Sequence, residues 1–136
     1  FISSGEMSFE DTGNFYVSAG TGENKIKELI PVLCDELINS PMNLTEEEIL
    51  KAKAKLKFSI VKSLESSSSN ADRWADHLLF YDRFIEIEEK IEKINNVSKE
   101  SIERVVRKML QSKPTIASIG PIKKLEKLEN IQSRFN

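Results

Sequence analysis

Two hydrophobic periods divide this sequence, and their order constrains the fold more than any single residue does. Between Phe15 and Ala19 apolar side chains recur at every second position, which is the pattern of a half-buried strand. From Ile26 onward most of the chain instead follows the i, i+3, i+4, i+7 stripe of amphipathic helices. Strand signals at both ends, with helical stripes between them, predict an α+β fold.

The strand-forming segments lie near the two ends of the sequence. Gly13 and Gly20 bound the alternating segment, and a turn at Glu10–Gly13 would let Phe1–Phe9 return beside it as an antiparallel partner. A short apolar run after Pro114 predicts a third strand. We expect strands at about 1–9, 13–20 and 115–119, joined in one mixed or antiparallel sheet that helices cover on one face.

Amphipathic stripes predict six helices. Thr21 is a candidate cap for the first, Pro31 should kink it or limit its first turn, and Pro41 follows its expected end. Thr45 and Glu48 form a capping box ahead of the second helix. The expected helices span about 22–39, 46–64, 70–84, 87–94, 99–111 and 123–131.

The second helix combines an apolar face with a ladder of lysines. Its apolar face on a helical wheel consists of Ile49, Ala52, Leu56, Ile60 and Leu64, with Lys51, Lys55 and Lys62 opposite. Glu47 precedes Lys51 at the spacing of an ion pair, and no aromatic platform accompanies the lysines. A solvated helix face is therefore favoured over a nucleic-acid surface.

Length and charge exclude several classes of function. The 136 residues fit one domain at most, and we expect a single partial domain over 1–136. The 20 basic and 22 acidic residues give a formal charge of -2, which offers no field for nucleic acid or anionic lipid. No apolar run reaches the roughly 20 residues of a membrane span. The start, Phe1–Gly5, lacks a signal-peptide pattern and resembles the inside of a strand, so we expect a piece of a longer protein.

The sequence offers few residues for an active site. One Cys and one His exclude a disulfide framework and a Cys/His zinc site. His77 has polar neighbours on its helix, and we expect it to be solvent-facing or salt-bridged because nothing specifies partners for metal or acid–base chemistry. Cys34 lies on an apolar face and is expected to be a small core residue.

Two further clusters receive structural interpretations. The carboxylates of Glu86, Glu88, Glu89 and Glu92 lack the spacing of a calcium loop. The serines 66–69 have no nucleophile motif around them and are interpreted as a flexible joint that breaks or bends the helix. We therefore expect no catalytic, cofactor-binding or metal-ligating residue in this chain.

Five segments stand out by their order and spacing. They are Asp11–Thr21 (DTGNFYVSAGT), Glu47–Lys57 (EEILKAKAKLK), Ser63–Ser66 (SLES), Val97–Ile102 (VSKESI) and Pro114–Pro121 (PTIASIGP). Together they resemble the insulinase family of zinc peptidases, which includes pitrilysin and the mitochondrial processing peptidase. The resemblance runs from about Asp11 to Pro121. It is closest to the bacterial and mitochondrial processing-peptidase branch, and to the second of the two homologous domains.

The resemblance implies that this chain is the zinc-free part of a larger enzyme. In that family the first domain carries HxxEH, with two zinc-binding His and a Glu that activates water, and none of this maps onto a chain with one His. The family's substrate-holding Arg and Tyr lie just upstream of the DTG strand, so they would precede Phe1. Zinc would thus belong to the parent protein, bound outside this segment.

The implied function is the structural and substrate-clamping half of a processing-peptidase-like zinc endopeptidase, inactive by itself. The expected partners are its own N-terminal zinc domain or a homologous subunit, a peptide substrate in the parent, and further copies of the segment, but neither nucleic acid nor a membrane. Alternatives are a non-catalytic partner subunit of such a peptidase, or a stand-alone protein-interaction module. The single Cys fits a reducing, cytoplasmic setting. The mitochondrial matrix and the periplasm are the alternatives.

Overall fold

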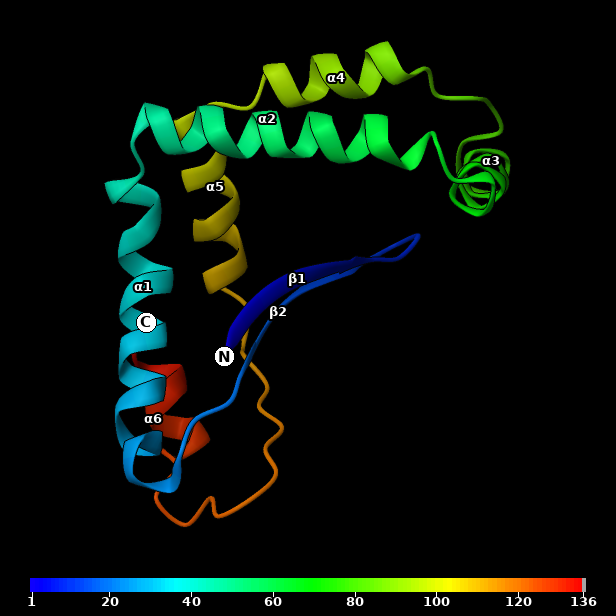
Figure 1. Cartoon of the computed structure of the whole chain (residues 1–136). Helices are drawn as coiled ribbons and strands as arrows, with labels where there is room; N and C mark the ends of the chain where they lie inside the picture. Colours follow the sequence, from blue (N-terminus) through cyan, green and yellow to red (C-terminus); the bar gives the residue numbers. More distant parts are fainter. Residues whose placement is uncertain (136) are drawn as a thin grey trace. The chain divides into compact units, whose positions relative to one another are not determined.

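The computed structural model describes residues 1–135, and the α+β prediction is confirmed for them (Figure 1). The chain forms two compact units. One contains residues 1–43 and the residues from 102 onward, and the other contains residues 44–101. In the first unit lie β1 (Ile2–Ser8), β2 (Gly13–Ala19), a short 3-10 helix (Glu23–Lys25), α1 (Ile26–Asn43) and α6 (Leu128–Ser133). In the second lie α2 (Glu46–Ser63), α3 (Ser67–Tyr81) and α4 (Ile87–Asn95), while α5 (Lys99–Leu110) begins there and continues into the first.

The two strands form the predicted antiparallel hairpin. Ile2 pairs with Ala19 at one end of the register and Ser8 pairs with Gly13 at the other. The chain reverses where the Phe9 N–H donates to the Thr12 carbonyl at 2.8 Å. The Tyr16 ring lies over Gly5, so a Cβ there would be 2.6 Å from Oη of Tyr16 and the ring would have to move aside.

The predicted third strand and the covered sheet were both wrong for the described residues. Residues 115–119 belong to no strand, and the sheet consists of β1 and β2 alone. A short apolar run does not specify a backbone partner, and this exposed segment has none within the described sheet. Nearly all hairpin side chains are exposed, with Val17 and Ala19 half-buried, so helices do not cover the hairpin as expected.

Three predicted helices have nearly the expected bounds, and three are displaced. The predictions for α2, α4 and α5 are confirmed to within a residue at each end. The helix predicted at 22–39 begins at Ile26 after a 3-10 turn preceded by Gly22, without a Thr21 cap, and runs through Pro41 to Asn43. Pro41 lies buried within the last turn of α1, where it has no N–H to donate to a helical carbonyl. The remaining helices were predicted at 70–84 and 123–131, and lie at 67–81 and 128–133.

A small apolar core holds α1 and α6 together in the first unit. Ile30, Cys34 and Ile131 are buried against one another, and Leu125 and Phe135 pack on them. Cys34 is only 1 % exposed, which confirms its prediction as a core residue. Burial raises the pKa of its thiol, so it is a poor nucleophile in the folded chain.

Contacts between α2 and α4 organise the second unit, where α4 runs alongside α2 (Figure 1). Ile49 is 4 % exposed, whereas Leu56, which the helical wheel placed on the same apolar face, is 52 % exposed. The lysine ladder also contributes to this contact, because Lys53 Nζ donates to the Asn95 carbonyl at 2.9 Å. A long lysine side chain can cover apolar surface while its ammonium group reaches a polar partner. The helical wheel therefore predicted the boundary between the buried and exposed faces of α2 wrongly.

The capping box at the start of α2 is confirmed. The Thr45 N–H donates to the Glu48 carboxylate at 2.9 Å, and the Glu48 N–H donates to Thr45 Oγ1 at 3.3 Å. The pair of Glu47 and Lys51 also forms, at 2.7 Å between highly exposed side chains. None of the helices in residues 1–135 is long and apolar enough to cross a membrane.

We expect the hairpin to promote self-association through its outer edge. Phe1 and Gly20 exchange both backbone hydrogen bonds, so alternation directs the Ser3 N–H towards β2 and the Ser4 N–H away from it. A free edge is a template for another strand. Ser4→Pro should therefore reduce the concentration dependence of the apparent mass in light scattering while leaving the hairpin intact.

Ser3→Pro is the matched control for this experiment, because it removes a hydrogen bond inside the hairpin and should lower stability instead. A wild-type chain that stays monomeric at high concentration would contradict the prediction.

Candidate functional site

The candidate site lies on α3, and the serines before it form its N-terminal cap. Ser66 Oγ accepts a hydrogen bond from the Ser69 N–H at 3.2 Å, and the Asn70 side chain donates to the Leu64 carbonyl at 2.8 Å. Ser67 to Ser69 belong to the first turn of α3. The predicted break in the helix is confirmed, because α2 ends at Ser63 and α3 begins at Ser67. Ser66 caps the new helix, since serine at a helix start replaces the missing backbone partners.

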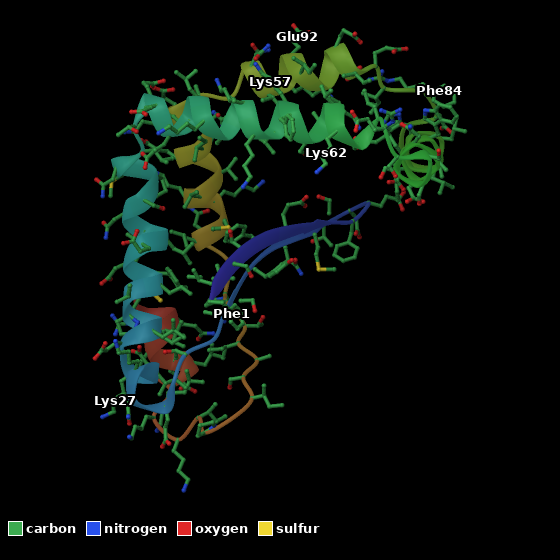
Figure 2. The ribbon with its side chains drawn as sticks, viewed as in Figure 1. Phe1, Lys27, Lys57, Lys62, Phe84 and Glu92 are labelled. Atoms are coloured by element: carbon green, nitrogen blue, oxygen red, sulfur yellow. The ribbon has the colours of Figure 1, made fainter. Side chains whose placement is uncertain are left out.

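A left-handed residue ends α3 and turns the chain back across it. Asp82 has φ 50°, a backbone conformation that few residues other than glycine adopt readily. After this turn the Ile85 N–H donates to Nδ1 of His77 at 3.1 Å. The rings of Trp74 and Phe84 meet edge to face, with their centroids 6.5 Å apart. Figure 2 shows Phe84 next to the end of α3.

These residues line an open pocket of about 330 Å³, which we call the His77 pocket. Its lining consists of Arg73, Trp74, His77, Phe84, Ile85, Glu86 and Ile87. All seven belong to the unit of residues 44–101, so the pocket is a feature of one compact unit. The volume is within the range of small-molecule sites in proteins.

His77 is buried, so the prediction of a solvent-facing or salt-bridged histidine was wrong. The residue is only 3 % exposed. Its sequence neighbours Asp72, Arg73 and Asp76 suggested a polar face, but the segment that covers its ring comes from beyond Asp82. Helix periodicity carries no information about that return of the chain.

Burial and neighbouring cations keep the imidazole neutral. Desolvation is the main cause that lowers the pKa of His77 below 6.5, followed by the positive charges of Lys90 and Arg73, and Asp76 opposes them only in part. Because Nδ1 accepts the Ile85 N–H, the single proton of the neutral ring is on Nε2. The imidazole therefore carries its donor on Nε2, an atom that is buried from solvent.

Two buried donors at the pocket have no partner in the structure. They are Nε2 of His77 and Nε of Arg73. The Arg73 guanidinium has one other contact, from Nη2 to the Asn70 side-chain oxygen at 2.9 Å. Leaving a buried donor unsatisfied costs about 1–3 kcal/mol, so each of these two nitrogens carries an energetic penalty in the folded chain.

The acidic cluster of α4 is divided between the pocket and an ion-pair network. Glu86 lines the pocket, whereas Glu89 receives both terminal nitrogens of Arg83 at 2.8 and 2.9 Å and Lys93 Nζ at 2.9 Å. These donors lower the pKa of Glu89 to about 2. Within residues 1–135 no three His, Cys, Asp or Glu side chains come together as a metal site.

The sequence contained only part of the signal for this pocket. Arg73, Trp74 and His77 are close together on one predicted helix, and helical spacing of three and four residues indicates that they share a face. The wall formed by Phe84 to Ile87 was not recognisable, because the predicted helix continued to residue 84 instead of ending at the left-handed Asp82.

Two comparisons with known proteins found no match. The sequence matches no model of a known protein family, and a search of curated proteins gives no significant match.

Replacing Asp82 tests the turn that forms the pocket. Asp82→Gly should raise the free energy of unfolding by up to about 1 kcal/mol, because glycine adopts positive φ without a steric penalty, and Asp82→Ala should lower it by about 1 kcal/mol. Chemical denaturation measures both.

Asp72→Gly, in the interior of α3, is the control and should be destabilising by about 0.5–1 kcal/mol. Equal effects of glycine at residues 72 and 82 would show that Asp82 is not left-handed.

His77 is the only histidine, so its NMR signals report the pocket without ambiguity. We expect it to titrate below 6.5 in the folded chain and to carry its neutral-state proton on Nε2. The unfolded chain protonates His77 more readily than the folded chain does. The contribution of neutral His77 to the free energy of unfolding should therefore be fully present above pH 6.5, and it should be lost as the pH drops from 6.5 towards the folded pKa.

His77→Asn retains a side-chain acceptor for the Ile85 N–H but does not titrate, so its stability should vary less with pH over that window. The ionisation of Glu89 contributes at lower pH, between 4.5 and about 2. A folded-state pKa at or above 6.5 would contradict a buried neutral His77.

Proposed function

We propose that this chain is the C-terminal part of the second, zinc-free domain of a processing-peptidase-like zinc endopeptidase. Its role would be to brace the clamp that holds a peptide substrate and to contact the zinc domain or a homologous subunit. The observation that carries the proposal is the order and spacing of five family-like segments between Asp11 and Pro121.

Local structure at four of the five segments supports the proposal. The DTG segment precedes and forms β2, and Glu47–Lys57 lies in α2 directly after the Thr45 cap. Ser63–Ser66 joins α2 to the next helix. Val97–Ile102 contains the start of α5, where Ser98 and Ser101 exchange side-chain to backbone hydrogen bonds of 3.0 and 3.3 Å. The fifth segment departs from the family pattern, because its strand is absent from the described sheet.

The residues of this chain do not fit the zinc ion of that family. His77 is its only imidazole, and Nδ1 is engaged by the Ile85 N–H. The positive charges of Lys90 and Arg73 lie close enough to lower its pKa, so they would also repel a metal cation. The chemistry of the metal would therefore depend entirely on residues outside this sequence, and the contribution of this chain would be to hold neighbouring parts in place.

Exposed apolar side chains agree with a segment that contacts a partner. Phe9, Phe15 and Tyr16 of the hairpin region are each exposed by 43 % or more, and so are Leu50 and Phe58 of α2. Exposed apolar side chains are available for burial against a partner, and contiguous apolar patches commonly mark interaction sites.

The test combines the parent gene with the purified chain. We expect the reading frame upstream of Phe1 to encode HxxEH and an Arg/Tyr pair, with the zinc motif at least a domain length, roughly 200 residues, away. The purified full-length product should contain stoichiometric zinc and lose peptidase activity to a chelator. The chain studied here should bind no zinc and cleave no peptide.

Other results would favour one of the alternative functions or contradict the proposal. A degenerate HxxEH in an otherwise similar parent would make the protein a non-catalytic partner subunit. A gene product without any such upstream domain would identify a stand-alone interaction module. Stoichiometric zinc in the isolated chain would contradict the assignment of the metal to another part of the protein.

A further inference from the structure

A second proton on His77 is incompatible with the hydrogen bond that covers its ring. Nδ1 accepts the Ile85 N–H at 3.1 Å, so a proton added to Nδ1 would meet another donor. Nε2 already carries the proton of the neutral ring, and it is buried with no partner among the described residues. An imidazolium in this position would therefore hold two donors without an acceptor, and burying a charge in that way is strongly unfavourable.

Charges on neighbouring parts of the chain oppose protonation further. Burial is the main cause that lowers the pKa of His77, and the positive charges of Lys90, Arg73 and Arg83 lower it further. These cations belong to α4, to α3 and to the turn between the two helices. Protonation would therefore place a fourth positive charge in the same region.

The nearby carboxylates compensate only in part. Asp76 raises the pKa of His77 without reversing the shift, and Glu86 lines the pocket but is not among the charges that shift this pKa. Glu89 of α4 is already engaged by two cations, at 2.8 and 2.9 Å. The Tyr81 ring, which meets the imidazole edge to face with centroids 6.3 Å apart, adds no charge. A protonated ring would therefore be stabilised mainly by contact with water.

One hydrogen bond and one ring contact attach residues 83–86 to α3 in the described chain. The hydrogen bond joins the Ile85 N–H to His77, and the ring contact joins Phe84 to Trp74. Before these residues α3 has already ended, and after them α4 begins and packs on α2. Residues 83–86 can therefore separate from α3 while both helices remain formed.

We propose that His77 is the centre of an acid-sensitive latch, in which a solvent proton that binds Nδ1 displaces the Ile85 N–H and residues 83–86 then separate from α3 until the imidazolium reaches water. We call the arrangement with this hydrogen bond the closed state and the arrangement without it the open state. Opening also separates Phe84 from Trp74 and exposes the half-buried Ile85. Acid therefore uncovers apolar surface that neutral pH keeps covered.

The direction of the pH dependence follows from the pKa of His77 in the two states. In the open state the solvated ring regains a pKa near 6.5, and in the closed state the pKa is lower. The open state therefore binds the proton more tightly, so acid favours it. Below pH 6.5 the ratio of open to closed chains rises by about tenfold for each pH unit until the closed-state pKa is reached, and above pH 6.5 it is constant.

Hydrogen exchange of the Ile85 amide measures this ratio in the intact chain. NMR follows the exchange from about pH 8 to about pH 4, and division by the rate of an unprotected amide removes the ordinary pH dependence of exchange. The resulting protection factor is compared with that of the Leu56 amide, which lies in the interior of α2 and reports unfolding of the whole unit. The signals of His77, the only histidine, give its protonation state at each pH.

We expect Ile85 to be protected above pH 6.5, and its protection factor to fall by about tenfold for each pH unit below that value. When the His77 signals show the imidazolium, Ile85 should exchange like an unprotected amide while Leu56 remains protected by at least about tenfold. His77→Asn is the matched control, because asparagine offers an acceptor to the Ile85 N–H but binds no proton. Its Ile85 protection should be constant over the same pH range.

A second pair of variants tests the ring contact that keeps the latch closed. Phe84→Ala removes the partner of Trp74 and should lower Ile85 protection by at least about threefold at every pH, and the pKa of His77 should move towards 6.5. Phe58→Ala removes an equal ring that is 68 % exposed on α2, and it should change neither quantity. Circular dichroism confirms that each variant is folded.

The proposal is overturned if Ile85 remains protected once His77 is protonated, because the imidazolium would then fit the closed state. It is equally overturned if Ile85 and Leu56 have the same protection at every pH, because His77 would then be protonated only by unfolding of the whole unit. The same holds if Ile85 is unprotected above pH 6.5, if His77→Asn shows the wild-type pH dependence, or if the two phenylalanine variants behave alike. None of these results bears on whether the parent gene encodes HxxEH.

Discussion

The hydrogen bond from the Ile85 N–H to Nδ1 of His77 is the interaction on which the candidate site depends. At 3.1 Å it joins the chain beyond α3 to the middle of that helix, and it buries the imidazole beneath the returning segment. It also fixes the neutral tautomer, because a ring nitrogen that accepts cannot carry the proton. The position of the donor on Nε2 follows from this contact, whereas the lowered pKa follows from burial of the ring and from the positive charges of Lys90 and Arg73.

A left-handed backbone at Asp82 makes that hydrogen bond possible. Had α3 continued to residue 84, as its hydrophobic pattern predicted, Phe84 would be part of the helix instead of turning back towards Trp74. A non-glycine residue with positive φ carries a steric penalty that surrounding contacts must offset. The contact between the Trp74 and Phe84 rings and the hydrogen bond from the Ile85 N–H to His77 provide such contacts. The turn and the pocket therefore stabilise each other.

Few side chains are fully buried in either unit, and this limits how much each can contribute to stability alone. Ile30, Cys34 and Ile131 form the buried cluster of the first unit, and Ile49 is the buried apolar residue of the second. Many large apolar side chains remain exposed, on the hairpin and on α2 and α3 in particular. A further protein surface that covered them would add hydrophobic stabilisation in proportion to the area buried. The proposal of a segment that braces a larger enzyme accounts for this distribution.

Local interactions explain which features were predictable from the residues alone. The α+β class, the hairpin, the Thr45–Glu48 capping box and the bounds of α2, α4 and α5 follow from periodicity and capping, which act over a few residues and are therefore written in the sequence. The prediction that Cys34 is a core residue was also correct, because the apolar face of a helix is buried against other apolar side chains.

The tertiary structure decided everything that depends on a partner distant in sequence. Residues 115–119 were predicted as a strand but pair with no other strand in residues 1–135. Lys53 became part of a helix contact because the Asn95 carbonyl lies within reach. His77 appeared polar by its neighbours, yet residues 84–87 line the cavity around it. The sequence by itself determined which segments are helix or strand and which faces are apolar. Only the folded chain, through the turn at Asp82, determined which of those faces meet and which donors are left without a partner, because long-range contacts depend on where the chain returns and not on local preference.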